Sequence, residues 1–216
     1  VLEIGSGWGS FAFYLISKFP DITIDTLTIS QEQYDFVKSK IEENHLQGNL
    51  NVIFKDYREH QGEYSRIYSI EMFEAVGMQY WQIYFDKIKD LLKPSGVFSM
   101  QTIVIFEGLF EKYSQKIDFI QKYIFPGGML PTVKTLENIA IEKKLDFFVK
   151  NQMADSYHQT LEMWRQNFNH KWDKIKNLGY SNEFKRMWNF YLSYCSGGFK
   201  AKTIDVFQID FTKNSN

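Results

Sequence analysis

The stretch VLEIGSGWGS at residues 1–10 decides how the rest of the chain is interpreted. Its first four residues are mostly apolar and predict a β-strand, and Gly5, Gly7 and Gly9 follow it at every second position. Glycines at this place let the backbone turn sharply from a strand into a helix whose N-terminus can bind part of a nucleotide. The spacing is one residue shorter than G-x-G-x-x-G, the fingerprint of dinucleotide binding. We therefore predict a nucleotide-binding turn with a different ligand.

The acidic residue Glu3 narrows the choice of ligand. It precedes the first glycine by two positions, where a carboxylate would repel phosphate and favour a cationic amino group. The short glycine spacing and this acid suit a ligand with ammonium and sulfonium groups, S-adenosylmethionine, and argue against a dinucleotide-dependent dehydrogenase. The turn alone also fits a tight strand-to-helix connection that binds nothing.

Strand-like and helical runs alternate through the first half of the chain. The expected strands are 1–4, 22–29, 50–54, 66–71 and 96–105, and the expected helices are about 8–19, 30–46 and 79–92. This alternation is typical of a parallel sheet covered by helices on both faces. We predict an α/β fold with a Rossmann-like sheet and a single domain over residues 1–216.

The pattern changes after residue 106. Helices are expected at about 111–124, at 132–144 and in a long stretch at 157–195, with a strand at 146–152. Residues 202–211 form a last alternating strand. Because polar residues interrupt its apolar positions, we interpret it as an edge or hairpin strand.

Composition limits the function classes. With 216 residues, of which 44% are apolar, the chain can bury one sizeable core. Its net charge of −1 gives no general attraction to nucleic acid. The single cysteine, Cys195, excludes internal disulfides and fits a reducing compartment, and no apolar run approaches the ~20 residues of a membrane span. The four histidines have no metal-ligand spacing. We expect a cytoplasmic protein without a metal site.

Residues beyond the second and third strands complete the expected nucleotide site. Thr28 and Gln33 can bind a ribose by hydrogen bonds, and we rank them above Asp25, which lies about 20 residues after the first glycine. Ser30 and Gln33 also match a capping box at the start of a helix.

The segment after the third strand offers contacts for a base. In KDYRE, Tyr57 is placed to stack on adenine, with Asp56 or Arg58 near the base edge. An exposed loop tyrosine without a ligand is an equally good interpretation.

Two carboxylates follow the fourth strand. Glu71 and Glu74 lie in SIEMFEAVG, at the strand end where open α/β sheets bind their ligands. The apolar residues before Glu74 would remove water from it and raise its pKa unless it is hydrogen-bonded. Glu74 is therefore a candidate functional acid, although acids after strands are often only helix caps.

Several motifs together resemble the cyclopropane-fatty-acyl-phospholipid synthase family, which includes the mycolic acid cyclopropane synthases. These are VLEIGSGWGS, SIEMFEAVG, IFPGGMLP at 124–131 and YLSYCSGGF at 191–199, and the resemblance runs from residue 1 to about 213. It implies a seven-stranded class I methyltransferase sheet with a helical insertion and a C-terminal hairpin strand. It also implies S-adenosylmethionine as cofactor and cyclopropanation of the unsaturated acyl chains of phospholipids.

The resemblance also implies a catalytic site. Glu74 would hold a bound bicarbonate that accepts the proton, Tyr191 would contribute its hydroxyl, and the backbone of Ile103 would add a contact. The helical stripe of Phe184, Trp188 and Tyr191 would aim that tyrosine inward.

One position departs from the family pattern. Gln101 stands where the best-known members have a histidine, and glutamine cannot titrate. It can still donate a hydrogen bond to an anion. The glutamine therefore leaves alternative functions open. The chain could be a fatty-acyl methyltransferase that stops at methyl or methylene addition, a small-molecule methyltransferase, or a binding module without turnover.

Two further expectations concern the chain ends and the surface. Family members carry a segment before the glycine-turn strand, so we expect the sequence to be a fragment. Residues 155–202 hold eight Lys or Arg against four Asp or Glu. This helical face, with Lys171, Lys174 and Lys176, is predicted to meet anionic phospholipids at the inner membrane surface, although a solvated helix face is the commoner meaning.

Overall fold

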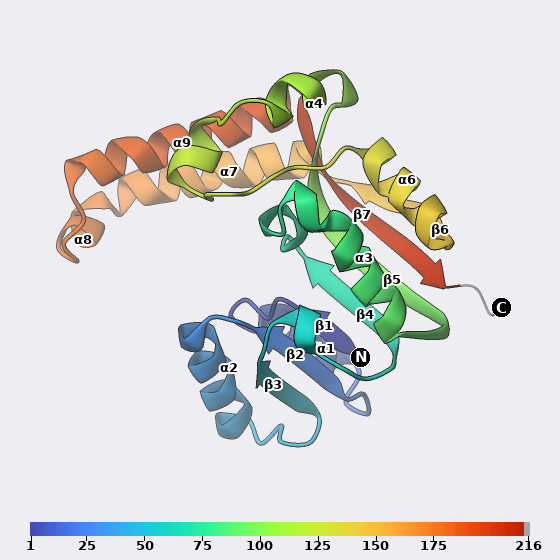
Figure 1. The fold of residues 1–216 in the computed structure, drawn as a ribbon. Helices are drawn as coiled ribbons and strands as arrows, with labels where there is room; N and C mark the ends of the chain where they lie inside the picture. Colours follow the sequence, from blue (N-terminus) through green and yellow to red (C-terminus); the bar gives the residue numbers. More distant parts are fainter. Residues whose placement is uncertain (214–216) are drawn as a thin grey trace.

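The computed structural model describes residues 1–213 and contains one seven-stranded sheet with the strand order β3-β2-β1-β4-β5-β7-β6 (Figure 1). The strands are β1 (Leu2–Ile4), β2 (Ile24–Thr28), β3 (Leu50–Phe54), β4 (Tyr64–Ile70), β5 (Leu92–Ile105), β6 (Leu145–Gln152) and β7 (Ile204–Lys213). β1 to β5 are parallel, and β7 runs antiparallel to both of its neighbours. The α/β sheet is confirmed, and the last three residues of the expected domain 1–216 lie outside the described residues.

Helices cover the sheet and extend beyond it. They are α1 (Ser10–Lys18), α2 (Gln31–Glu43), α3 (Trp81–Leu91), α4 (Glu107–Ser114), α5 (Phe119–Tyr123), α6 (Val133–Lys143), α7 (Ala154–His170), α8 (Trp172–Lys176) and α9 (Asn182–Lys200). Three short 3-10 turns are η1 (Tyr57–Glu59), η2 (Phe73–Ala75) and η3 (Met78–Tyr80). Two helical stretches expected to be continuous, about 111–124 and 157–195, are therefore each interrupted.

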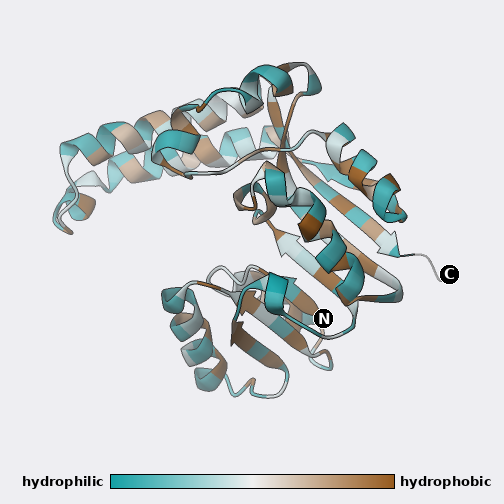
Figure 2. Ribbon diagram, in the orientation of Figure 1, coloured by the Kyte–Doolittle hydropathy of each residue, from teal (hydrophilic) through white to brown (hydrophobic). Residues whose placement is uncertain are grey.

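Apolar side chains from helices and strands form the core. One cluster joins α3 and α6 to β4, β5 and β7, and a second joins α1 and α2 to β2 and β3. Figure 2 shows hydrophobic residues along the strands, whereas α2 is largely hydrophilic on its outer side. Each fully buried Leu, Ile or Phe contributes about 1.5–3 kcal/mol, so this packing holds the carboxyl ends of β1 to β5 in one fixed edge.

The last strand lies inside the sheet. β7 pairs with β5 and with β6, so the edge interpretation of this strand is wrong, while its antiparallel pairing is confirmed. Its polar side chains have partners: Ser99 donates to Asp210 at 2.6 Å, and Gln208 donates to Gln101 at 2.9 Å. Because these polar side chains have hydrogen-bond partners inside the sheet, a strand whose apolar pattern is interrupted by them does not have to lie at the edge.

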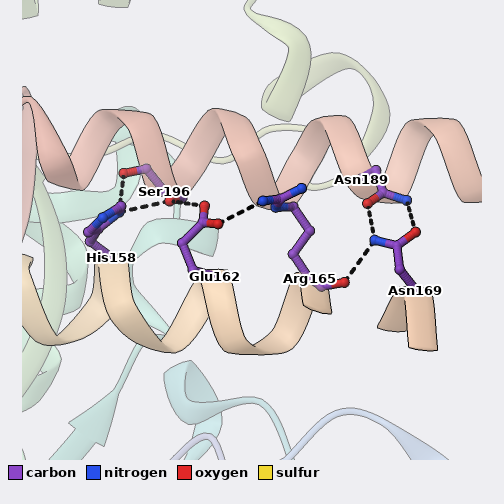
Figure 3. A network of polar contacts seen from close by, with 6 residues as sticks. All are labelled: His158, Glu162, Arg165, Asn169, Asn189 and Ser196. Carbon is purple, nitrogen blue, oxygen red and sulfur yellow. Dashed lines mark hydrogen bonds and ion pairs between the residues drawn. The ribbon is translucent and has the colours of Figure 1, made fainter. Parts of the chain in front are cut away.

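The helices α7 and α9 lie side by side and project from the sheet, with α8 at their far end (Figure 1). Polar contacts join them along their length (Figure 3). The Ser196 hydroxyl donates to Glu162 at 2.7 Å and lies 2.8 Å from the Nδ1 atom of His158. Further out, Asn169 and Asn189 exchange amide hydrogen bonds. This network fixes the register of two helices that both carry residues of the candidate site.

Candidate active site

The turn after β1 is built on left-handed glycines. Gly5, Gly7 and Gly9 have φ values of 93°, 49° and 82°, which side chains other than glycine rarely adopt. A Cβ atom added to Gly9 would lie 2.7 Å from the Phe13 ring, whereas one added to Gly7 would meet nothing within 4 Å. The turn therefore requires glycine and leaves open space above Gly7.

The acid before this turn is held inside the sheet. Glu3 is 3% exposed and accepts a hydrogen bond from the hydroxyl of Thr26 on β2. Burial raises the pKa of Glu3 to about 7, against the lowering effect of that hydrogen bond. The structure thus gives the carboxyl a partner in the neighbouring strand, and a contact with a ligand's ammonium group stays a prediction.

The end of β2 brings the predicted ribose contacts together. The Thr28 hydroxyl donates to the Gln33 amide oxygen at 2.9 Å and accepts from the backbone of Ser30 at 3.1 Å. The Ser30 side chain caps α2 as predicted, but the reciprocal half of the capping box is wrong because Gln33 is bound to Thr28 instead. Asp25 pairs with Leu2 near the start of β1, away from this edge.

The three residues expected near a base follow β3. Asp56 caps η1 and pairs with the Arg58 guanidinium at 2.6 Å, which lowers the pKa of Asp56. The Tyr57 ring packs edge-on against the Tyr84 ring at 5.2 Å. Tyr57 is therefore a partly packed side chain rather than an exposed loop tyrosine, and its stacking on a base stays a prediction.

A cavity of about 810 Å³ opens beside the carboxyl ends of β4 and β5. Most of its wall is apolar and comes from α4, α5, the segment between α5 and α6, and α9. Gly128 fits against the backbone oxygen of Phe125, and Gly197 leaves open space where a Cβ would stand. The motifs IFPGGMLP and YLSYCSGGF thus both contribute residues to one cavity wall.

The carboxyl of Glu74 lies in this wall. Its Oε1 atom accepts a 2.6 Å hydrogen bond from the backbone N–H of Ile103, and its Oε2 atom is buried without a partner among residues 1–213. Burial raises the pKa of Glu74 to about 7, the Ile103 N–H lowers it, and the charge of Glu71 raises it further. Glu74 therefore changes its protonation state near neutral pH.

A second polar cluster surrounds Glu71, which also lines the cavity. Gln101 donates from Nε2 to Glu71 at 2.8 Å and to the Tyr157 hydroxyl at 2.9 Å. The Tyr157 hydroxyl itself donates to the same Glu71 oxygen. Burial and this carboxylate raise the pKa of Tyr157, so its hydroxyl remains a donor at neutral pH.

The structure brings together some predicted residues and adds another. Glu74 and Ile103 are in contact, and Gln101 is two residues away on β5. Tyr191 lines the cavity, and its hydroxyl makes no hydrogen bond within residues 1–213, whereas Tyr157 joins the cluster. Sequence reasoning gave Tyr157 no role, because only its place in the motif YHQTLEMW pointed to it.

Metal-ligand clusters and membrane-spanning helices are both absent from residues 1–213. No three His, Cys, Asp or Glu side chains gather there as metal ligands would. In the same part of the chain no helix has the length and apolar character needed to cross a membrane. The sequence context of His158 favours a surface histidine, but its ring contacts Ser196 between α7 and α9 and is partly buried.

This sheet order, with a glycine turn after β1 and a cavity at the carboxyl edge, defines the class I S-adenosylmethionine-dependent methyltransferase fold. The model of the mycolic acid cyclopropane synthetase family matches residues 1–209. The chain belongs to that family, as its motifs predicted.

Individual relatives agree with this assignment. The chain is 35% identical to the cyclopropane-fatty-acyl-phospholipid synthase of Escherichia coli, an alignment that covers 99% of this chain and 53% of the relative. It is 33% identical to the tuberculostearic acid methyltransferase UfaA1 of Mycobacterium tuberculosis, covering 96% and 48%. The chain thus spans about half the length of these curated relatives.

Solved structures show the same fold. The mycolic acid cyclopropane synthase CmaA1 in complex with SAH and CTAB superimposes with a TM-score of 0.87 at 25% identity, covering 98% of this chain and 77% of that chain. The cyclopropane synthase MmaA2 from Mycobacterium tuberculosis gives a TM-score of 0.88 at 24% identity, covering 98% and 77%.

Proposed function

We propose that this chain forms the methyl-transfer part of an S-adenosylmethionine-dependent enzyme that converts a double bond in a phospholipid acyl chain into a cyclopropane. The observation that carries the proposal is the apolar cavity of about 810 Å³ with the Glu74 carboxyl in its wall. An acyl chain fits an apolar cavity, and a half-buried acid offsets positive charge that develops within it. The phospholipid synthase of Escherichia coli supports this substrate class.

The glycine turn suits the methyl donor. The space above Gly7 admits a ligand close to the backbone. The turn is bound to the end of β2, because Leu27, the residue before Thr28, accepts from the backbone N–H groups of Gly5 and Ser6 at 3.1 and 2.8 Å. Gly5, Gly7, Gly9, Thr28 and Gln33 would hold the donor, with Glu3, Asp56, Tyr57 and Arg58 as further predicted contacts. When bound, S-adenosylmethionine supplies a methyl group made electrophilic by the positive sulfur.

The chain's own residues prepare the acceptor. Apolar side chains from α4, α5 and α9 exclude water from the acyl chain, which protects a carbocation from attack by water. The Ile103 N–H fixes Glu74 at the strand edge, where its carboxyl faces the developing positive charge. Tyr191 contributes its ring and hydroxyl to the same wall.

A second candidate is a methyltransferase that adds a methyl or methylene group to the acyl chain. Gln101 favours it, because an amide cannot relay a proton. The tuberculostearic acid methyltransferase among the relatives supports it as well. In both candidates the methyl donor and the acyl chain are the same, and the cyclopropane and methylene products differ in whether a 1,2-hydride shift precedes loss of the methyl proton.

Lipid analysis of cells that express the full-length protein tests these candidates. A mass gain of about 14 units with loss of olefinic protons indicates a ring, whereas a retained exocyclic alkene indicates methylene addition. Calorimetric titration with S-adenosylmethionine should give one site. A full-length protein that binds lipid without binding the donor would instead be the non-catalytic binding module.

We also propose that the protein works in the cytoplasm at the inner membrane surface. Lys171, Lys174 and Lys176 are exposed at the far end of the α7–α9 pair (Figure 1), where anionic headgroups would attract them. Replacing all three with Glu should weaken binding to anionic vesicles at low salt. The charge-matched control is a variant in which Glu replaces three lysines outside α7–α9, namely Lys38, Lys93 and Lys134. Unchanged vesicle binding by the first variant would rule out this surface.

A further inference from the structure

Three hydrogen-bond donors at or beside the cavity already bind the chain's own carboxylates. Gln101 and Tyr157 both donate to the Glu71 Oε1 atom, and the Ile103 N–H donates to Glu74. These groups include the amide and backbone donors that the family resemblance would assign to a bound bicarbonate. In this chain Glu71, a residue of the cavity wall, accepts from two donors that lie beside it.

A bound bicarbonate does not fit these residues. The cavity wall contains Glu71, Glu74 and Asp118, and no Lys, Arg or His of residues 1–213 lines it. An added anion would lie near two carboxylates without a neighbouring cation, and like charges repel one another. We therefore derive no step through bicarbonate.

We propose that the Glu71 carboxylate is the built-in proton acceptor of the reaction and takes the place of a bound anion. The inference rests on the proposed function. After methyl transfer, the acyl chain carries a carbocation. Glu71 removes one proton from the added methyl group, the electron pair of that C–H bond forms the new C–C bond, and Glu71 becomes a neutral acid. If a 1,2-hydride shift first moves the positive charge to the methyl-bearing carbon, loss of a methyl proton to Glu71 with formation of a C=C bond gives the methylene product.

The contacts around Glu71 orient its carboxylate. Gln208 donates to the Gln101 amide oxygen at 2.9 Å, which directs the Gln101 NH₂ group toward Glu71 and Tyr157. The Glu71 backbone N–H donates to the Gln101 carbonyl at 2.8 Å. One glutamine thus holds both the backbone and the side chain of Glu71, which is the preorganisation that an efficient base requires.

Glu71 suits proton acceptance better than Glu74 does. The Glu74 Oε1 atom is bound to Ile103, and its Oε2 atom, although it has no partner, is buried away from solvent. Glu71 is exposed to solvent. It can therefore release the accepted proton to water after each turnover, whereas Glu74 remains in place to offset charge.

Substitutions at position 71 test this assignment in the full-length protein. Glu71 has a φ of 51°, so glycine fits its backbone without strain. In bicarbonate-free buffer, Glu71→Gln should lower turnover by about 10²-fold or more, and so should Glu71→Gly. Added bicarbonate or formate should restore much of the activity of Glu71→Gly, because glycine leaves space for the anion and frees the hydrogen-bond donors. The same anions should not restore Glu71→Gln, because the glutamine side chain fills that space. Glu137→Gln, an exposed change on α6, is the control.

A second measurement does not depend on turnover. Carbon-13 NMR of labelled bicarbonate should show binding to Glu71→Gly and none to the wild-type protein. Wild-type binding of bicarbonate, a bicarbonate requirement of the wild type, or Glu71→Gln activity within about threefold of wild type would each overturn the inference and leave the proposed function standing. A wild-type protein that binds the donor but modifies no lipid would overturn the proposed function itself.

Discussion

The glycine turn and the cavity wall are two parts of one sheet edge, but they are built in different ways. The turn comes from five consecutive residues, Gly5 to Gly9, and acts through backbone geometry. The wall joins Glu71 to Gln101 and Tyr157, which are 30 and 86 residues away in the chain. A contiguous motif therefore forms the proposed donor site, whereas tertiary packing forms the proposed acceptor site.

The two regions also differ in how they tolerate change. The turn depends on the absence of side chains, and the wall depends on side chains that satisfy one another. A substitution in the turn should affect donor affinity, and one in the wall should affect turnover with the donor still bound. Substitutions and a pH series can measure how far this separation holds, and the strongest effect is expected in the wall.

Replacing Glu74 with Gln should reduce turnover by about 10²- to 10³-fold while S-adenosylmethionine binds as before. The reason is that glutamine keeps the size of the side chain and an acceptor for Ile103 but loses the charge that faces the carbocation. Steady-state lipid turnover and calorimetry on the same preparation check this. A parallel loss of donor affinity would show that the two regions are not separate.

The stability of the chain should fall as the pH rises from about 4.5 to about 7. Glu3 and Glu74 have pKa values of about 7 in the folded state against an ordinary value of 4.5, so the folded protein binds more protons than the unfolded chain in this range. Stability then decreases with pH, by at most about 3 kcal/mol for each group.

Glu3→Gln separates the two contributions to this pH dependence. The variant should lose roughly half of the decrease, because only Glu74 still titrates in the range. Urea unfolding at pH 5 and pH 8 gives the free energies of unfolding for both proteins. An equal decrease in wild type and variant would contradict the assignment of half the effect to the buried carboxyl of β1.

Gly7→Ala should weaken donor binding by about tenfold. A left-handed backbone costs alanine about 1–2 kcal/mol, and the new methyl group would enter the open space above the turn. Gly179→Ala is the matched control, since Gly179 has a φ of 98° with nothing within 4 Å and lies in the loop before α9. Titration of both variants should show a loss of affinity only at position 7.

Ser196→Ala should lower the free energy of unfolding by about 1 kcal/mol. The change removes the bond to Glu162, although Arg165 still pairs with that carboxylate and His158 keeps the Ser196 carbonyl (Figure 3). Ser193→Ala, on the exposed side of α9, should change stability by less than about 0.5 kcal/mol. Equal effects of the two substitutions would show that the network does not join α7 to α9.

The sequence predicted the parts of the molecule that depend on neighbours along the chain. The glycine turn, the alternation of strands and helices, and an acid with a raised pKa at Glu74 all follow from local pattern. The interior position of β7 was not predictable in this way. Its polar residues find partners on β5, and such cross-strand pairs have no signature in one strand alone.

The same reason explains what was missed in the candidate site. Tyr157 and Gln208 reach Gln101 only after the insertion of α7 to α9 has folded back onto the sheet. Tyr191 lies in the cavity wall, and its catalytic role stays a prediction. Which of two tyrosines contacts the polar cluster depends on the register of the helix pair, and His158, Glu162 and Ser196 set that register.

The left-handed backbone at Glu71 has a genetic consequence. Glycine and glutamate codons can differ by one base, and glycine adopts this conformation more readily than any other residue. A single point mutation can therefore replace a glycine at position 71 with a glutamate without disturbing β4, which ends at the residue before it. An enzyme dependent on dissolved bicarbonate and one independent of it would then be one nucleotide apart.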